Sequence, residues 1–231
     1  MVERTLALDQ MQAAVDDYIG VHLLGDDPVL DATRGANAAG GLPDIDVTPA
    51  QGKLLHLLAR MVGARRILEV GTLGGTSTVW LARALPADGR LVTLELVPLY
   101  AEVARANLDR AGVADRCEIR VGPAAETLDA MVAAGEGPFD LVFIDADKQG
   151  NVTYLRAALA MSRPGTAIIV DNVVRAGAVL DPAHPDPRVR GTRALFEAVA
   201  AEPRLSATAV QTVGAKNWDG FLLAMVGGGD G

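Results

Sequence analysis

The sequence predicts a doubly wound α/β fold with a seven-stranded, mostly parallel sheet. Short and almost wholly apolar runs alternate with longer helical stretches, and two final runs follow one another across a turn. Alternating strands and helices pair in parallel through right-handed crossovers, whereas two strands joined by a turn form an antiparallel hairpin. With 231 residues, half of them hydrophobic, the chain is long enough for one core, and we expect a single domain over residues 1–231.

The N-terminal part, residues 1–46, is expected to form a helical cap on this domain. Apolar residues recur at steps of three and four over residues 5–24, which is the spacing of one helical face. Gly25–Asp46 is rich in Asp, Gly, Ala and Pro and is expected to be a connecting segment with room for one short helix. Thr48 and Pro49 then start a helix that runs to Gly63, because they suit its N-cap and first position.

The middle of the chain supplies five strands buried on both faces, with helices between them. The expected strands are Arg66–Gly71, Arg90–Glu95, Cys117–Gly122, Phe139–Asp145 and Thr166–Asp171. The expected helices are Thr76–Leu85, Leu99–Ala111, Ala124–Ala134 and Asn151–Met161. At the C-terminal end, Leu205–Val213 and Phe221–Val226 should form a hairpin at one sheet edge, and the tail Gly227–Gly231 should fray.

Charge and cysteine content exclude several classes of partner. The 29 acidic residues outnumber the 21 basic ones, and a net charge of −8 disfavours nucleic acid and anionic membranes. The single Cys117 can form neither an internal disulfide nor a thiolate metal site, which favours a reducing compartment. Charged residues interrupt Met1–Gly25, so a signal peptide or membrane span is not expected there. We therefore expect a cytoplasmic protein.

Acidic and amide side chains lie where the predicted strands end. Glu69, Glu95 and Asp145 end or nearly end three strands, and a fourth ends with Asp171 followed by Asn172. In an open α/β sheet, ligands bind in the crevice beyond these carboxyl ends. Any one of the acids could instead cap the next helix. Four together favour a ligand site.

The glycine-rich loop Gly71–Gly75 follows the first buried strand and leads into a helix. Glycines suit a sharp bend that approaches a ligand, and Glu95 at the end of the next strand could accept two ribose hydroxyls, so the order predicts a nucleoside cofactor. The spacing does not match the dinucleotide fingerprint, which disfavours NAD. Glu69, two positions before Gly71, suits a cationic amino acid and sulfonium better than a diphosphate. A tight structural turn remains the alternative for the glycines alone.

Asp145, Asp171 and Asn172 form a set of oxygen ligands at neighbouring strand ends. Two carboxylates and an amide oxygen suit a hard divalent cation, with Mg²⁺ first and Mn²⁺ or Ca²⁺ also compatible. The alternative is a hydrogen-bonded acidic cluster without metal.

Four segments together resemble the cation-dependent class I O-methyltransferases, the group of catechol and caffeoyl-coenzyme A O-methyltransferases. These segments are Ile67–Ser77, Gly122–Ala124, Asp145–Lys148 and Asp171–Asn172. The resemblance extends from about Leu42 to Val226. It implies a Rossmann-like fold, methyl transfer from S-adenosylmethionine to a hydroxyl of a small catechol-like acceptor, and a homodimer.

The resemblance also implies roles for individual residues. The expected contacts with S-adenosylmethionine are Val47, Glu69, Gly71, Thr72, Ser77, Glu95, Ala124 and Asp147. The expected metal ligands are Asp145, Asp171 and Asn172. Asp145 and Lys148 are the candidate catalytic residues, because Lys148 lies three residues past Asp145 and could take the acceptor's proton. The alternative for Lys148 is a surface lysine paired with Asp147.

Departures from the family pattern concern the acceptor. Similar sequences often have Tyr in place of Thr76 and an Asn-Tyr pair in place of Gly150–Asn151. The long stretch Val173–Arg190 is expected to be a lid or acceptor wall. His184 within it is expected to be solvated rather than a base, and Trp218 could either cover an aromatic acceptor or belong to an ordinary turn.

Three other functions compete with this interpretation. They are a metal-independent methyltransferase for an acceptor such as RNA, an NAD-dependent oxidoreductase and a non-catalytic binding module. The acidic composition counts against RNA, and the glycine spacing counts against NAD.

Overall fold

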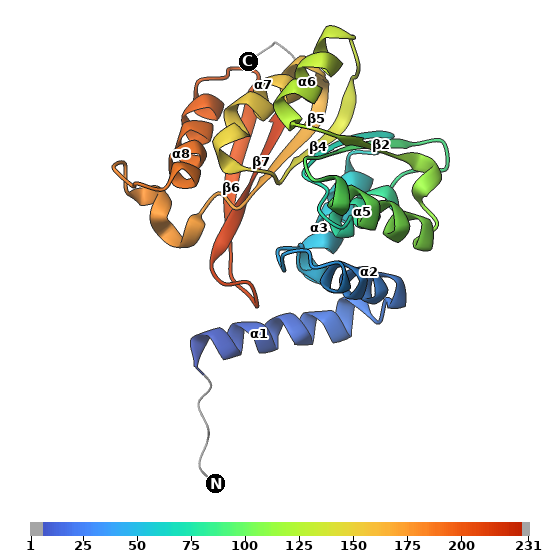
Figure 1. Cartoon of the computed structure of the whole chain (residues 1–231). Coiled ribbons are helices and arrows are strands. Elements are labelled where there is room, and N and C mark those ends of the chain that lie inside the picture. The colour runs from blue at the N-terminus through green and yellow to red at the C-terminus, as the bar shows by residue number, and fades with distance from the viewer. Residues whose placement is uncertain (1–6, 228–231) are drawn as a thin grey trace.

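The computed structural model describes residues 7–227 and shows one seven-stranded sheet in the order β3-β2-β1-β4-β5-β7-β6 (Figure 1). The strands are β1 (Arg66–Val70), β2 (Arg90–Glu95), β3 (Cys117–Val121), β4 (Phe139–Ile144), β5 (Ser162–Asp171), β6 (Leu205–Thr212) and β7 (Asp219–Val226). The first five pair in parallel, and β7 pairs antiparallel with both β5 and β6. The expected doubly wound sheet with its antiparallel hairpin is confirmed.

The helices are α1 (Leu8–Ile19), α2 (Pro28–Ala39), α3 (Pro49–Met61), α4 (Thr76–Ala82), α5 (Pro98–Arg110), α6 (Ala124–Ala133), α7 (Asn151–Ala160) and α8 (Pro187–Ala200). A π-helical turn, Gly20–Leu24, continues α1. α4 ends three residues earlier than expected, because Pro86 disfavours a helical conformation for Leu85. β5 starts four residues earlier than expected, and Pro164 is tolerated in this exposed first part of the strand.

One helix, α2, gives bounds to the short helix allowed for its segment, and another, α8, corrects the sequence prediction. α2 fills 12 residues of the expected connecting segment Gly25–Asp46, and α8 takes up the end of the stretch Val173–Arg190, which was expected to be a loop. Each starts at an Asp-Pro pair: Asp27 accepts a hydrogen bond from the Leu30 amide, and Asp186 accepts one from the Arg188 amide. Aspartate is a strong N-cap and proline suits the first helical position, so these pairs carried a helix signal that the composition of the segments obscured.

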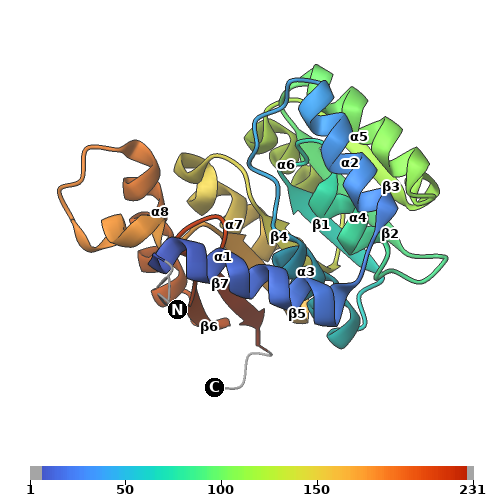
Figure 2. The ribbon, with the colours of Figure 1, turned by 90° about the horizontal axis from the view of Figure 1, so that it is seen from below.

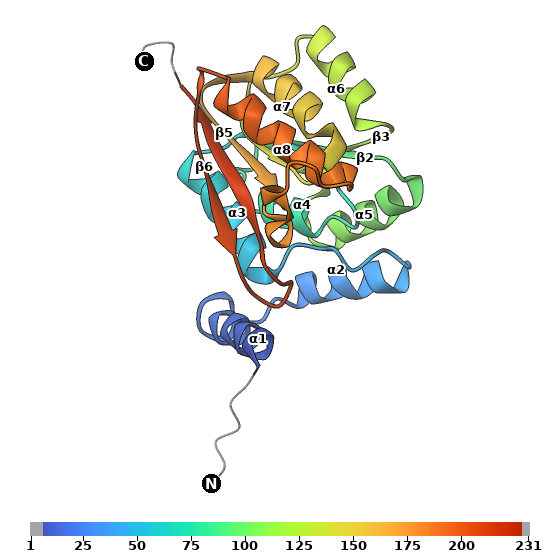
Figure 3. The same ribbon diagram turned by 90° about the vertical axis from the view of Figure 1, so that its left-hand side faces the viewer.

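Helices cover both faces of the sheet (Figures 1 and 3). α3, α4 and α5 pack on one face, and α6, α7 and α8 pack on the other. In β1, Ile67 belongs to the first of these cores and Leu68 and Val70 to the second, as the alternation of side chains along a strand requires. The carboxyl ends of β1 and β4 therefore lie side by side between two cores.

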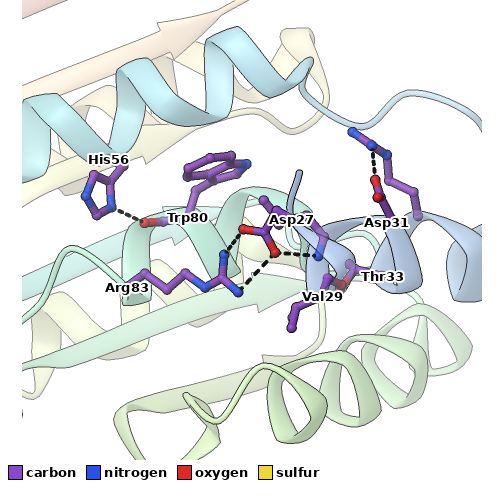
Figure 4. A network of polar contacts seen from close by, with 9 residues as sticks. Asp27, Val29, Asp31, Thr33, His56, Trp80 and Arg83 are labelled. Carbon is purple, nitrogen blue, oxygen red and sulfur yellow. Dashed lines mark hydrogen bonds and ion pairs between the residues drawn. The ribbon is translucent and has the colours of Figure 1, made fainter. Parts of the chain in front are cut away.

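The N-terminal helices contact the body at a few points. α1 lies outside the body and runs beneath it (Figures 1 and 2), where Asp16 accepts a hydrogen bond from the Ala215 amide in the β6–β7 turn. Asp27 pairs with Arg83 at the end of α4, and the Nδ1 atom of His56 on α3 lies 3.2 Å from the Trp80 carbonyl oxygen (Figure 4). These contacts fix α2 and α3 against α4.

Two expectations fall partly outside the described chain. Residues 5 and 6 of the first expected helix lie there, as does the expected frayed tail beyond Gly227. Among residues 7–227, no helix has both the length and the apolar character required to cross a membrane.

Candidate active site

A cavity of about 690 Å³ lies at the carboxyl ends of the strands, next to the point where β1 separates β2 from β4. This is the crevice in which open α/β sheets bind ligands, and its volume is typical of small-molecule sites. Its wall includes most of the predicted cofactor contacts, namely Val47, Gly71, Thr72, Ser77, Glu95, Ala124 and Asp147. Asp145, Lys148 and Asn172 also line it. Glu69 and Asp171 lie behind the wall, where both are buried.

Gly71 allows the ends of β1 and β4 to meet. Its φ is +102°, and a Cβ atom there would lie 2.2 Å from the carbonyl oxygen of Asp145. No side chain fits at this distance, and positive φ strains residues other than glycine. The glycine therefore brings the glycine-rich loop Gly71–Gly75 directly against the strand end that carries Asp145.

Glu95 fixes the other side of the glycine-rich loop. Its Oε2 atom accepts a hydrogen bond of 2.7 Å from the Leu73 amide, and its Oε1 atom accepts one of 2.9 Å from the Val97 amide. A carboxylate has about four lone-pair sites, so two amide donors leave capacity for further donors such as ribose hydroxyls. These two backbone amides hold the Glu95 side chain at the cavity wall.

Glu69 acts on the site through Ser77. Its carboxylate is fully buried and accepts hydrogen bonds from Ser77 (2.6 Å), Thr78 (2.5 Å) and Thr93 (2.7 Å). Burial raises the pKa of Glu69 to about 7, although the three hydroxyl groups oppose the shift. Ser77 lines the cavity, so Glu69 is placed to orient this cavity-facing hydroxyl from behind.

The raised pKa of Glu69 predicts a pH-dependent stability. The folded protein binds this proton more tightly than the unfolded chain, whose glutamate pKa is 4.5. The resulting stabilisation is fully present below pH 4.5 and is lost as the pH rises through 7. In metal-free and cofactor-free protein, we expect the free energy of unfolding of wild type, minus that of Glu69→Gln, to fall by about 2 to 3 kcal/mol between pH 5 and pH 8.

Urea unfolding at the two pH values measures this difference. Glu102→Gln, at an exposed position on α5, is the matched control. The difference in free energy of unfolding between wild type and this variant should be the same at both pH values. A difference between wild type and Glu69→Gln that is the same at both pH values would contradict the prediction.

Asp145 and Asp171 form the acidic part of the candidate metal site. The Oδ2 atom of Asp171 accepts a 2.6 Å hydrogen bond from the Gln51 side chain on α3. Burial and the nearby negative charge of Asp145 raise the pKa of Asp171 to about 7, and the charge of Lys148 opposes this shift. The structure thus brings the two carboxylates close enough for their charges to interact, with Asn172 next to them on the cavity wall.

This donor set fits a hard cation. Among the described residues, no group of three His, Cys, Asp or Glu side chains comes together as a metal site. The expected set differs from such a group because its third member is the amide of Asn172. Asp145 and Asn172 line the cavity and Asp171 lies just behind them, and two carboxylates with an amide oxygen suit Mg²⁺, which keeps open positions for water or substrate.

Lys148 pairs with Asp145, and its alternative assignment to Asp147 is wrong. Its Nζ atom lies 2.8 Å from Oδ1 of Asp145, and the residue is 5% exposed. Asp147 instead accepts a hydrogen bond of 3.0 Å from the Gly150 amide and one from the hydroxyl of Tyr154. The lysine is therefore a buried group of the site and not a surface residue.

Tyr154 and Gln51 are site residues that the sequence analysis missed. Tyr154 lines the cavity, and a Cβ atom on Gly150 would lie 2.3 Å from its ring. An Asn at position 150, as similar sequences often have, would displace this tyrosine. A helical spacing from Asp147 could have indicated Tyr154. The sequence holds no local signal for Gln51, which lies 120 positions before its partner Asp171.

The residues expected around the acceptor divide into two groups. Arg175 and Arg188, within or next to the stretch expected to be a lid, line the cavity. Trp218 and His184 do not: the Trp218 indole donates to the Gln211 side chain, and the ring of His184 accepts from the Asp186 amide. This part of the cavity wall therefore includes the two arginines and not the tryptophan.

Known proteins share this sequence and architecture. A family model described as O-methyltransferase matches residues 22–225. A catechol O-methyltransferase of Mycobacterium tuberculosis is 53% identical over 212 residues, which cover 92% of this chain and 94% of that protein. A catechol O-methyltransferase of Niastella koreensis is 47% identical over 218 residues, which cover 94% of this chain and 99% of that protein. The solved structure of an O-methyltransferase from Bacillus cereus in complex with SAH has a TM-score of 0.93 at 52% identity, and covers 95% of this chain and 100% of that one. The chain therefore belongs to the family of S-adenosylmethionine-dependent O-methyltransferases.

Proposed function

We propose that this O-methyltransferase acts on a hydroxyl of a small catechol-like aromatic compound and that a divalent cation, Mg²⁺ first, assists. The observation that carries the proposal is the position of Asp145, Asp171 and Asn172 beside a cavity whose other wall holds the expected cofactor contacts. The relatives named catechol O-methyltransferase support the same acceptor class.

The walls of the cavity assign a role to each side of the site. S-adenosylmethionine carries an activated methyl group, so the protein has to hold the donor and the attacking oxygen in line. The glycine-rich loop and Glu95 would hold the nucleoside half, and Asp147 would hold the amino-acid end. These contacts lie on the β1, β2 and β4 ends, whereas Asn172 follows β5 on the acceptor side.

Lys148 has the position of a general base. Its Nζ atom is paired with Asp145 in a buried part of the wall, and as a neutral amine, the form that a cation held beside it would favour, it could accept the proton of the acceptor hydroxyl. A divalent cation held by Asp145, Asp171 and Asn172 would supply stabilisation of the negative charge on the hydroxyl oxygen. Gln51 would hold Asp171 in one orientation through its 2.6 Å hydrogen bond.

Methyl transfer to catechol from radiolabelled S-adenosylmethionine tests this function. We expect product formation that stops with EDTA and resumes with added Mg²⁺. Activity that is indifferent to the chelator would overturn the role of the cation. Calorimetry with S-adenosylhomocysteine and with NAD separates the proposal from an oxidoreductase, and absence of turnover with any phenol would favour a binding module.

We also propose that a second copy of this chain covers α1. No residue of α1 is buried, and one face of the helix exposes Leu8, Met11, Val15 and Tyr18 at steps of three and four. Leu57 and Met61 on α3 are also exposed. Exposed apolar residues at helical spacing are typical of a helix that packs against a partner.

Replacing Val15 with Asp is expected to convert the dimer to monomer, raising the dissociation constant at least about tenfold, because it places a charge in an apolar interface. Sedimentation velocity over a range of concentrations measures the change. Gln10→Glu adds the same charge on the opposite face of α1 and should leave the dimer intact. A wild-type protein that sediments as a monomer would refute the proposal.

A further inference from the structure

Arg175 is a cation on the cavity wall whose side chain has no partner among residues 7–227. Three cationic side chains line the cavity: Lys148, Arg175 and Arg188. Lys148 is paired with Asp145 at 2.8 Å, and Arg188 is paired with Asp186 at 2.7 Å. In the described part of the chain, the guanidinium of Arg175 makes no hydrogen bond and no ion pair. Asp186 lies close enough for its charge to interact with Arg175, but it pairs with Arg188, so the guanidinium of Arg175 keeps its hydrogen-bond donors available to whatever occupies this side of the cavity.

The backbone of Arg175 is held by the β6–β7 turn. Its amide donates a 3.0 Å hydrogen bond to Asp219, and the next amide, that of Ala176, donates to the Trp218 carbonyl. The φ of Arg175 is +56°, a left-handed conformation that is strained for a residue with a side chain. Surrounding contacts must maintain such a conformation, and strain of this kind is concentrated at ligand sites. Arg175 is thus anchored at a defined place on the wall.

The place of Arg175 is on the acceptor side. It lies three residues after Asn172, on the segment that follows β5, whereas the expected cofactor contacts are at the ends of β1, β2 and β4, at the start of α6 and on the segment before α3. Asp147 on the β4 side would accept from the ammonium group of S-adenosylmethionine, which places the amino-acid end of the cofactor away from this segment. A free guanidinium there is available to the acceptor.

We propose that Arg175 is an anion subsite and that the natural acceptor is a dihydroxy aromatic acid whose carboxylate pairs with it. This inference rests on the proposed function and names the acceptor more narrowly. A guanidinium matches a carboxylate with two parallel hydrogen bonds. A phosphate ester would call for more than one free cation, and Arg188 is already occupied by Asp186. A neutral catechol would leave Arg175 without a partner.

A matched pair of acceptors tests the subsite. 3,4-Dihydroxybenzoate and 3,4-dihydroxybenzamide have the same ring and hydroxyls and nearly the same size, but only the first carries a carboxylate. We expect wild type to prefer the benzoate in kcat/KM by roughly tenfold or more, the range of a hydrogen-bonded charge. In Arg175→Ala the ratio of the two kcat/KM values should fall to about one, chiefly through the KM of the benzoate. Arg175→Lys should retain part of the preference.

Arg105→Ala, at an exposed position on α5, is the control and should keep the wild-type ratio. Calorimetry with S-adenosylhomocysteine shows that each variant is folded. An unchanged ratio in Arg175→Ala, or a wild type without preference for the benzoate, overturns the inference. Methylation of catechol by the wild type decides the proposed function separately: if catechol is methylated and the ratio is near one, only the anion subsite fails.

Discussion

Replacing Asp171 with alanine is expected to reduce methyl transfer by roughly a thousandfold or more while affinity for S-adenosylhomocysteine stays within a few fold. The loss reflects several kcal/mol of charge stabilisation that the cation provides in the transition state. Cofactor affinity should persist because Asp171 lies behind the cavity wall, and the expected cofactor contacts are on other strand ends. Radiolabelled methyl transfer measures the first quantity and calorimetry the second.

Two further variants show whether the effect belongs to this carboxylate. Gln51→Ala removes the hydrogen bond to Asp171 but keeps the carboxylate, so a smaller loss is expected, together with a higher Mg²⁺ requirement. Asp129→Ala, at an exposed position on α6, should behave as wild type. If cofactor affinity collapsed together with activity in Asp171→Ala, the division of the cavity into a cofactor side and a cation side would be wrong.

β1, β2, β4 and β5 were predictable because each contains a buried, local apolar run, whereas the expected burial of β3 on both faces is wrong, because β3 lies at the sheet edge with no buried residue. A strand buried on both faces can be identified from its own sequence, without knowing which strand it pairs with. The turn before β7 identifies the antiparallel hairpin at the end of the chain. α2 was expected only as a short helix without bounds, and α8 was missed, because Gly, Ala, Pro and Asp dominate the composition around them. The Asp-Pro pairs at positions 27–28 and 186–187 were nevertheless the same kind of start signal that identified α3.

The depth of a residue along its strand accounts for the place of Glu69. Gly71 follows the last residue of β1, and Glu69 lies two positions earlier, which is about 7 Å below the rim of the sheet at the usual rise per residue. Glu95, by contrast, is the last residue of β2 and reaches the cavity. Spacing alone could therefore have separated the residue behind the wall from the one on it.

The pairings within the site were not predictable in the same way. The contact of Gln51 with Asp171 joins two segments that are distant in the chain, and it depends on how α3 packs beside β5. The choice of Lys148 between Asp145 and Asp147 depends on the 3-10 turn Lys148–Gly150, which Asp147 caps. Local patterns identify which residue types reach a strand end, whereas packing decides which of them meet.

Replacing Lys148 with methionine is expected to lower kcat by about a hundredfold to ten-thousandfold at neutral pH, the range for loss of a general base. The KM for S-adenosylmethionine should change little, since the amine lies against Asp145. Methionine keeps most of the apolar stem that is buried in the wall. Lys53→Met, at a lysine outside the cavity, is the matched control.

The pH and Mg²⁺ dependence of Lys148→Met separates proton transfer from charge balance. Without the ammonium group, the negative charges of Asp145 and Asp171 are no longer balanced by a lysine. If Lys148 only balances these charges, saturating Mg²⁺ should restore the activity of the variant. If Lys148 takes the proton of the acceptor, saturating Mg²⁺ should not restore the activity of Lys148→Met. The activity of Lys148→Met should instead rise with pH relative to that of wild type, because a growing fraction of the acceptor hydroxyl ionises in solution without the enzyme's base. Full rescue by Mg²⁺ at neutral pH would therefore remove Lys148 from the chemistry and leave it an electrostatic role.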